Sequence, residues 1–356
     1  MNNGCVGGPP AWRHLPLLTA GALLLAASTA QGQAPLPPVT IGAGLQTSFM
    51  HTSPEVGDGT DAFRLNSARL YVNGPVTSKI KFMFNTEYDG ASSHIGVIDA
   101  VARIEASPKF NIWMGRFLPP SDRANLYGPY YSHHWAVYTD GVQDGYPFVT
   151  TGRDDGVTYW GQFGKVKVSA GAFDGESATG NADVLTAARV MVDFWDPEDG
   201  YYLNGTYYGG KNLLAVGAAV QAQSGDTAST VDFLLERKLA GGASFSVESE
   251  YANYDKLGGY DSRYGSSEGA YILASYLFGK PAGMGKVEIL GKFAKATFSK
   301  GLSIANPDYD QKTSEFNLNY IIKEFNARVM FFFKNTTFTG VKSDSKQVGV
   351  GLQIQM

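Results

Sequence analysis

Alternation of apolar and polar residues is the dominant pattern along the chain after residue 30. In 347–356, Val, Leu, Ile and Met residues alternate with Gln and Gly, and similar alternation recurs in 39–49, 79–88 and 324–334. Successive side chains of a β-strand point to opposite faces, so each run is predicted to be a strand with one apolar face and one polar face. The runs extend over about 8–13 residues, close to the length that a tilted strand needs to cross a membrane.

A soluble β-sandwich shows the same period, but three features favour a membrane barrel. The first is the length of the runs. The second is that their polar faces carry charged residues in mid-run, which a wet lumen tolerates and a sandwich core does not. These residues are Asp99, Arg103, Glu248, Glu250, Lys292 and Glu315. The third is that short connections such as 73–78 and 164–165 alternate with longer polar ones such as 51–61 and 299–310, which is the barrel pattern.

The fold class predicted from this pattern is all-β: a transmembrane antiparallel β-barrel of about 16 strands with a long in-folded loop. The strands are expected to start near residues 39, 62, 79, 95, 110, 155, 165, 186, 212, 229, 243, 268, 286, 311, 325 and 346. An even number places both chain ends on one side, which requires 195–211 to be a connection on that same side. Closure is needed because an open strand edge would leave backbone groups unpaired in lipid.

The first 30 residues are expected to be an export signal. Arg13 precedes the apolar segment 15–27, and the small residues 28–30 follow it. Thirteen apolar residues are too few for a typical spanning helix, which leaves an uncleaved anchor as the less favoured alternative. Cleavage is expected between residues 30 and 34, so that 31–356 forms the outer-membrane barrel. The predicted location is the bacterial outer membrane, with its lipid as a partner.

The amino-acid composition excludes several kinds of site and partner. The only cysteine, Cys5, lies within the expected signal, so the mature chain has no disulfide, thiolate metal site or cysteine nucleophile. The 29 Lys and Arg residues are outnumbered by 33 Asp and Glu residues, and no basic block occurs, which argues against nucleic acid as a partner. The 43 glycines, 20 tyrosines and 21 phenylalanines agree with strands joined by many turns.

The segment 118–153 is the one long stretch without clean alternation, and it is rich in aromatic residues. Long loops are usually functional, and a barrel of sixteen strands is wide enough to need narrowing, so this loop is predicted to fold inward and form the constriction. The alternative is an outward loop packed against a neighbouring subunit. The constriction and solute-binding candidates are Arg116, Arg123, His133, His134 and Arg153. The predicted lumen-lining cations are Arg69, Lys79, Lys81, Arg103, Arg189, Lys292 and Arg328.

Five motifs in order resemble the phosphate-selective porin O and P family. They are FRLNSARLYVNG (63–74), WMGRFLPP (113–120), GRDDGVTYWGQF (152–163), SAGAFDGES (169–177) and FNLNYIIKEFNARVMFFF (316–333). The resemblance covers nearly the whole mature chain and implies a sixteen-stranded, homotrimeric barrel that passes anions. The loop departs from the family pattern: it has no Lys and contains Asp122, Asp140 and Asp144. We therefore expect at most a mild anion or phosphate preference, because the sign of charge near the narrowest point sets selectivity.

Enzyme chemistry is not indicated. No GxSxG motif occurs, and the adjacent His133 and His134 would face opposite ways on a strand, which is poor for one metal ion. The sequence thus predicts no catalytic residue, no metal and no cofactor. The predicted function is a passive, water-filled channel for small hydrophilic solutes or ions. The alternative is a plugged barrel that serves as an adhesin, another binding protein or a structural protein of the outer membrane.

Overall fold

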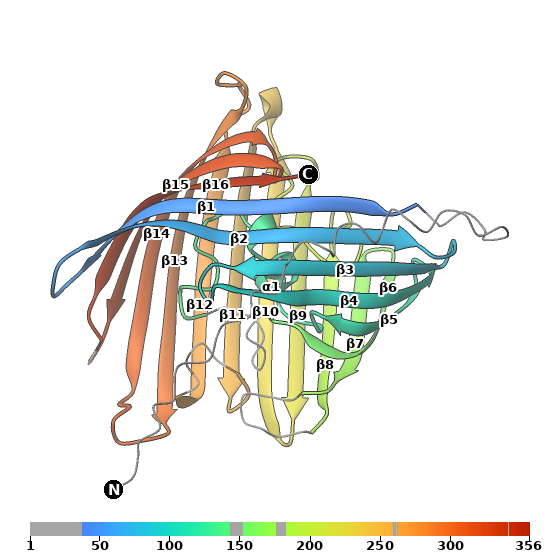
Figure 1. Ribbon diagram of the computed structural model, residues 1–356, viewed down its shortest axis with the longest axis horizontal. Coiled ribbons are helices and arrows are strands. Elements are labelled where there is room, and N and C mark those ends of the chain that lie inside the picture. Colours follow the sequence, from blue (N-terminus) through green and yellow to red (C-terminus); the bar gives the residue numbers. More distant parts are fainter. Residues whose placement is uncertain (1–37, 143–151, 176–182, 259–260, 262, 341) are drawn as a thin grey trace, which may run out of the picture. The chain divides into compact units, whose positions relative to one another are not determined.

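A closed antiparallel barrel of sixteen strands forms the body of the protein in a computed structural model of the chain (Figure 1). The structure describes residues 38–142, 152–175, 183–258, 261, 263–340 and 342–356. The expected signal, residues 1–30, lies outside this part of the chain, as do loop residues 143–151. Each strand pairs with its neighbours in sequence, and the pairing of the first strand with the last, from Gly44 with Gln355 to Pro54 with Ser345, closes the barrel.

The elements have the following bounds: β1 Thr40–Pro54, β2 Thr60–Pro75, β3 Ile80–Asp89, β4 His94–Ser107, β5 Phe110–Phe117, α1 Arg123–Tyr127, η1 Pro129–Tyr131, β6 Asp154–Phe163, β7 Val166–Phe173, β8 Leu185–Asp193, β9 Leu213–Gln223, β10 Asp226–Lys238, η2 Ala240–Gly242, β11 Ser244–Asp255, β12 Tyr264–Leu277, β13 Lys286–Gly301, β14 Tyr309–Lys323, β15 Ala327–Phe338 and β16 Ser345–Gln355.

The predicted count and order of strands are confirmed. The largest difference in a strand start is at β12, expected near residue 268 and beginning at Tyr264. Its first residues, Gly265 to Ser267, are small and polar and show no apolar alternation, so pairing with β13 rather than local pattern extends the strand.

The two faces of the wall differ in chemistry as the alternation predicted. On β13, Phe293 points outward and is 50% exposed, whereas its neighbour Lys292 points inward and is 4% exposed. The outward face is apolar along other strands as well, for example at Phe82, Ile272, Phe316 and Phe331. This surface suits lipid, and the inward charges require the polar interior that a lumen provides.

Two rims are distinguished by their connections. The rim at which β1 begins and β16 ends is called the terminal rim, and the opposite one the far rim. The connection 194–212 between β8 and β9 lies at the terminal rim, as the strand count required. At the far rim, β9 and β10 are joined by Ser224 and Gly225, both with positive φ, as two-residue hairpin turns demand. No helix in the described ranges is long and apolar enough to span a membrane.

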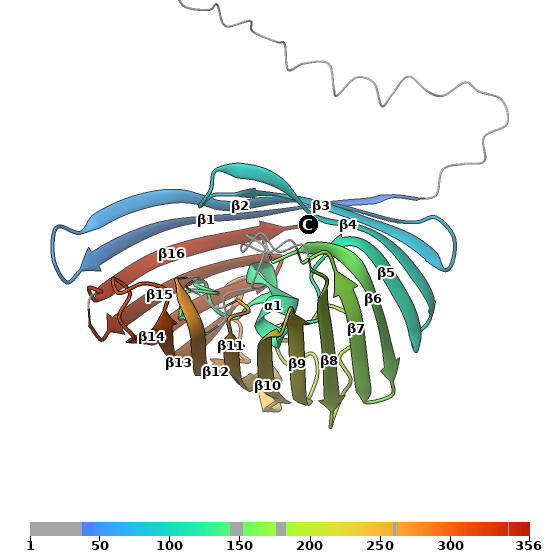
Figure 2. The same ribbon diagram turned by 90° about the horizontal axis from the view of Figure 1, so that it is seen from below.

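The loop between β5 and β6 folds into the barrel, which confirms the prediction for its described part, residues 118–142. Figure 2 shows α1 surrounded by the strands of the wall. Asp122 caps this short helix, since its side chain accepts a hydrogen bond of 2.8 Å from the backbone nitrogen of Asn125. Beside β5 to β8 the lumen is filled by an aromatic cluster that includes Trp113, Trp160 and Tyr201.

Candidate functional site

Two segments enter the lumen from opposite rims and meet inside it. The inner loop, residues 118–142, comes from the far rim, and the counter-loop, residues 194–212, comes from the terminal rim. The backbone nitrogen of Leu203 donates to the carbonyl of Leu126 at 3.2 Å, and that of Gly205 donates to the carbonyl of Tyr131 at 2.8 Å. Each segment therefore satisfies backbone groups of the other, as buried backbone must.

An ion pair between Arg123 and Glu198 joins these two segments. Both side chains are fully buried, and the guanidinium of Arg123 also donates to the carbonyl of Asn204 at 3.1 Å. Burial alone would raise the pKa of Glu198, yet the adjacent Arg123 holds it below its usual value. On the wall side, Asp232 of β10 accepts from the backbone nitrogen of Arg123 at 3.2 Å. Arg123, a predicted constriction residue, thus connects the inner loop to the counter-loop and to the wall.

Two arginines of the wall hold the inner loop in place. Arg189 on β8 binds Asp232 through both terminal nitrogens, at 2.5 and 2.8 Å, and donates to the carbonyl of Ser121 at 3.1 Å. Arg328 on β15 donates to the carbonyl of Tyr130 at 3.2 Å and to the side chain of Gln353 at 2.7 Å. A guanidinium suits this role because its donors form a fixed fork.

The two predicted loop histidines are buried, each 1% exposed. Nε2 of His133 lies 2.5 Å from the carbonyl of Gly205 in the counter-loop. His134 lies beside Lys292 of β13, with 3.3 Å between Nε2 and Nζ, and Lys292 also pairs with Asp140 at 2.6 Å. Burial lowers the pKa of His133 to about 3 and that of His134 well below 6.5. Both rings are therefore neutral at physiological pH.

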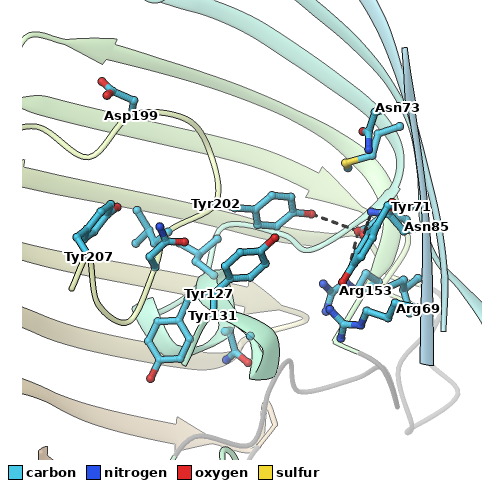
Figure 3. A pocket seen from close by; sticks show the side chains of 18 of the residues that line it. Arg69, Tyr71, Asn73, Asn85, Tyr127, Tyr131, Arg153, Asp199, Tyr202 and Tyr207 are labelled. Carbon is cyan, nitrogen blue, oxygen red and sulfur yellow. Dashed lines mark hydrogen bonds and ion pairs between the residues drawn. The ribbon is translucent and has the colours of Figure 1, made fainter. Parts of the chain in front are cut away.

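A cavity of about 500 Å³, called the terminal cavity, lies on the terminal-rim side of the inner loop (Figure 3). Its wall side consists of residues from β2, β3 and β4, together with Arg153 beside the start of β6. Its other side consists of residues from the inner loop and the counter-loop. The lining residues are Arg69, Tyr71, Asn73, Met83, Asn85, Ile98, Asp99, Asn125, Leu126, Tyr127, Gly128, Tyr131, Arg153, Asp199, Tyr202, Leu203, Asn204, Tyr207 and Lys211.

A second cavity of about 800 Å³, called the far cavity, lies at the far rim. It is lined by the far-rim ends of β1 to β3 and by inner-loop residues around Trp135. Its lining residues are Met50, Phe63, Arg64, Leu65, Asn66, Tyr88, Asp89, Gly90, Ala91, Trp135, Ala136, Val137, Thr139, Phe332, Lys334 and Gln347.

Strand β2 shows how close the two cavities come to each other. Asn66 lines the far cavity and Arg69 lines the terminal cavity. Of the two residues between them, Ser67 faces the lumen and Ala68 faces outward. The hydroxyl of Ser67 donates to the carboxylate of Glu87 and lies 3.0 Å from the hydroxyl of Tyr130. Arg69 pairs with Glu87 at 2.9 Å and stacks over the ring of Tyr130 at 4.6 Å. These four residues, Ser67, Arg69, Glu87 and Tyr130, are called the junction.

The predicted site residues are distributed unevenly around the two cavities and the junction. Arg69 and Arg153 line the terminal cavity, and Arg153 lies 3.4 Å from Asp99. Arg116 was expected at the loop, facing the lumen, but it lies on the outward face of β5, 3.5 Å from Asp155. The reason is strand parity, since its neighbour Phe117 takes the inward position.

The remaining predicted cations lie nearer the terminal rim. Lys79 lies in the exposed turn before β3 rather than in the lumen, because β3 begins one residue later. Lys81 is on the inward face and pairs with Glu105 at 2.5 Å. Arg103 stacks over Trp113 at 5.4 Å and lies 3.8 Å from Glu105.

The counter-loop is the part of the site that sequence reasoning missed. Two signals were available: the connection 195–211 is long for the side that otherwise has short turns, and it contains Tyr201, Tyr202, Tyr207 and Tyr208. The aromatic content that marked the inner loop as buried therefore marks this segment too. The contact of Ser67 with Tyr130 was likewise not predicted, because it joins a strand to a loop residue 63 positions away in the sequence.

The comparisons with known proteins establish the fold. No family model matches the chain, and no curated protein does. Among solved structures, OprB of Pseudomonas putida at high pH has a TM-score of 0.65 at 9% identity, covering 89% of this chain and 94% of its own. The chain has the fold of the bacterial outer-membrane barrels.

Two further structures share this fold. The anion-selective porin of Comamonas acidovorans has a TM-score of 0.54 at 14% identity, covering 90% of this chain and 99% of its own. The trimer form of OmpT, an outer membrane protein of Vibrio cholerae, has a TM-score of 0.55 at 14% identity, covering 89% and 99%. The apolar outward face of this barrel suits the lipid of the bacterial outer membrane, the location that the sequence predicted. The resemblance of the chain to the phosphate-selective porin O and P family stays a prediction.

Proposed function

We propose that the protein is an outer-membrane channel for small hydrophilic solutes, with a path along β2 to β4. The observation that supports this is the pair of cavities, one toward each rim, between which Ser67 is the one inward-facing residue of β2. Beside β5 to β8 the lumen holds the aromatic cluster, so the proposed path follows β2 to β4 and passes the junction. By the usual arrangement of such barrels, the terminal rim faces the periplasm.

Strong ion selectivity is not expected, because several of the lumen cations have carboxylate partners. Arg69 faces Glu87, Arg153 faces Asp99, and Arg189 faces Asp232. A charge ring selects ions through its net field, which such pairing cancels. At most a mild anion or phosphate preference is therefore proposed. The chain is further proposed to be a homotrimer and not an enzyme.

Conductance in a planar bilayer tests the channel. The wild-type protein should pass steady single-channel current. Ser67→Trp, which places a large ring in the junction, should abolish most of that current. Ser314→Trp is the matched control, because Ser314 lies on the outward face of β14 and a tryptophan there meets lipid. Wild-type current that is unchanged in Ser67→Trp would contradict the proposed path.

The interlocked lumen segments favour a second candidate, a plugged barrel that binds a partner or has a structural role. Here the Arg123–Glu198 ion pair would act as a latch between the inner loop and the counter-loop. The same bilayer experiment separates the two functions. A wild-type protein that passes no current, combined with an Arg123→Gln variant that does, would establish the plugged state.

A further inference from the structure

We infer that the terminal cavity is a binding site for neutral, hydroxylated ring solutes of the sugar class. This inference deepens the proposed function and rests on it, since it names the solutes that would use the path. It is carried by three properties of the cavity: paired charges, tyrosine rings and amide side chains among its lining residues. Figure 3 shows several of these tyrosine, asparagine and arginine side chains.

Each cation that lines the cavity has a carboxylate partner. Arg69 is 2.9 Å from Glu87, and Arg153 is 3.4 Å from Asp99. Lys211, in the counter-loop, is 3.3 Å from Asp199, which lines the same cavity. An anionic solute would have to compete with these carboxylates for the cations, so the cavity offers it little net attraction. A neutral solute pays no such penalty.

Tyrosine rings supply the flat apolar surface of the cavity. Five tyrosines line it: Tyr71, Tyr127, Tyr131, Tyr202 and Tyr207. The hydroxyls of three of them are already engaged, since Tyr127 donates to Glu248 at 2.8 Å, Tyr202 to Asp99 at 3.2 Å and Tyr207 to Glu198 at 2.9 Å. These bonds fix the rings, and partly exposed rings such as those of Tyr131, Tyr202 and Tyr207 can contact the carbon skeleton of a solute.

Amide side chains supply the polar contacts. Asn73, Asn85 and Asn204 line the cavity, and an amide can both donate and accept, which matches a hydroxyl group. Asn85 is 7% exposed, and its Nδ2 donates to Asp99 at 2.8 Å. Its Oδ1 accepts no hydrogen bond from any residue that the structure describes. A buried acceptor without a partner is costly, and a solute hydroxyl would satisfy it.

Together these features fit a solute with apolar ring faces and hydroxyls around its edge. Small-molecule sites combine aromatic walls with a few placed polar groups in cavities of roughly 300–1,000 Å³, and the terminal cavity, at about 500 Å³, lies in that range. Inorganic phosphate lacks an apolar face and needs unpaired donors of positive charge, so it fits this cavity less well.

The test is binding to the purified protein in detergent, measured by calorimetry or saturation-transfer NMR with glucose, maltose and inorganic phosphate as probes. Maltose or glucose should bind, and phosphate should not compete. Tyr131→Ala should weaken sugar binding by about tenfold, because it removes a stacking face. Tyr131→Phe keeps the ring and should bind as the wild type does. Tyr88→Ala is the matched control, since Tyr88 lines the far cavity.

Several outcomes would overturn the inference. Absence of sugar binding would do so, as would equal binding by the wild type and a Tyr131→Ala variant that migrates as a folded barrel. Phosphate binding that is lost in Arg153→Gln would show an anion site instead. The proposed function fails separately: sugar binding that depends on Tyr131, in a protein that passes no current, would retain the site and reject the channel.

Discussion

Gly44 on β1 faces the ring of Tyr130 at very short range. A Cβ atom added at Gly44 would lie 2.7 Å from Cε1 of Tyr130 and 3.1 Å from its Cζ, so only glycine allows this approach. Tyr130 is fully buried and forms part of the junction. A residue without a side chain thus determines how far the inner loop reaches toward the wall, and with it the position of the junction.

Gly44→Ala is predicted to displace Tyr130 and to change single-channel conductance. Overpacking of this kind costs about 1–3 kcal/mol, which the inserted loop rather than the paired wall would absorb. Gly291→Ala is the matched control, because a Cβ there meets no atom within 4 Å. Equal conductance of Gly44→Ala and the wild type would show that Tyr130 does not border the path.

Two arginines that sequence patterns grouped together have opposite surroundings. Arg123 is buried against Glu198, whereas Arg116 lies on the outward face of the wall beside Asp155. Removing one member of a buried pair leaves the other charge uncompensated, which typically costs about 3–5 kcal/mol, whereas an exposed pair contributes little.

Arg123→Gln is therefore predicted to loosen the inner loop and the counter-loop while leaving the barrel folded. Hydrogen exchange should become faster in residues 121–139 and 198–206, with strands β9 to β16 unchanged. Arg116→Gln should leave exchange in both segments as in the wild type. Equal protection of these segments in all three proteins would mean that the Arg123–Glu198 pair does not hold them.

At the scale of elements, each strand is defined by its two faces. On β13, Phe293, Lys295 and Ile289 point outward, and Lys292 and Leu290 point inward. Lys295 lies two residues beyond Phe293 toward the far rim and pairs with Asp310 at 3.1 Å, so this outward charge has a carboxylate partner. Phe293 lies deeper in the wall, so a charge placed there would meet lipid.

Phe293→Arg is predicted to destabilise the barrel by about 2–4 kcal/mol, the cost of a cation near the middle of the bilayer. The free energy of unfolding of the wild type and the variant, measured by denaturant titration in lipid vesicles, gives this difference. Phe293→Leu keeps the apolar face and should cost much less. A Phe293→Arg barrel as stable as the wild type would place this part of β13 outside the lipid.

At the scale of the whole molecule, two segments from opposite rims are packed inside a closed wall. His133 connects them through the carbonyl of Gly205 and faces Glu288 at 3.8 Å, with Arg328 nearby. The cations that act on His134 are Lys292, Arg328 and Lys334, and Lys292 is itself paired with Asp140. Protonation of either histidine inside the lumen is therefore disfavoured by burial and, for His134, by its neighbours.

Acid should consequently loosen the inner loop. A released histidine has a pKa near 6.5, and burial lowers that of His133 to about 3, so the inserted state binds fewer protons. Its stability is complete above pH 6.5 and falls as pH decreases toward 3. At pH about 5.5 each histidine should weaken insertion by about tenfold. Hydrogen exchange of the loop, corrected for the intrinsic effect of pH, measures this.

The variant that replaces both His133 and His134 with Gln serves as the control for that experiment. It removes the two titrating groups, so exchange in its inner loop should depend less on pH between about 7 and 5 than in the wild type. A wild-type loop that is equally protected at both pH values would show that the histidines do not regulate insertion.

The sequence by itself determined the strands of the barrel wall and which of their faces points outward. Alternation of period two is a local property, and chain closure follows because lipid cannot satisfy free strand edges, so the number and order of strands and their faces were all predictable. The inward placement of Arg69 and Arg189 followed from the same parity. Two predicted positions were wrong. Lys79 lies in a turn because β3 begins one residue later than expected, and Arg116 lies on the outward face because strand parity gives the inward position to Phe117.

Only the tertiary structure decided what fills the lumen. The inner loop and the counter-loop have no periodic pattern, and their positions depend on contacts between residues far apart in the chain, such as Arg123 with Glu198 and Tyr130 with Ser67. Which cation meets which carboxylate, and therefore whether a charge is available to a solute, is set by these contacts. Local sequence carries the strand pattern of a barrel, but packing within the closed wall decides where its path lies.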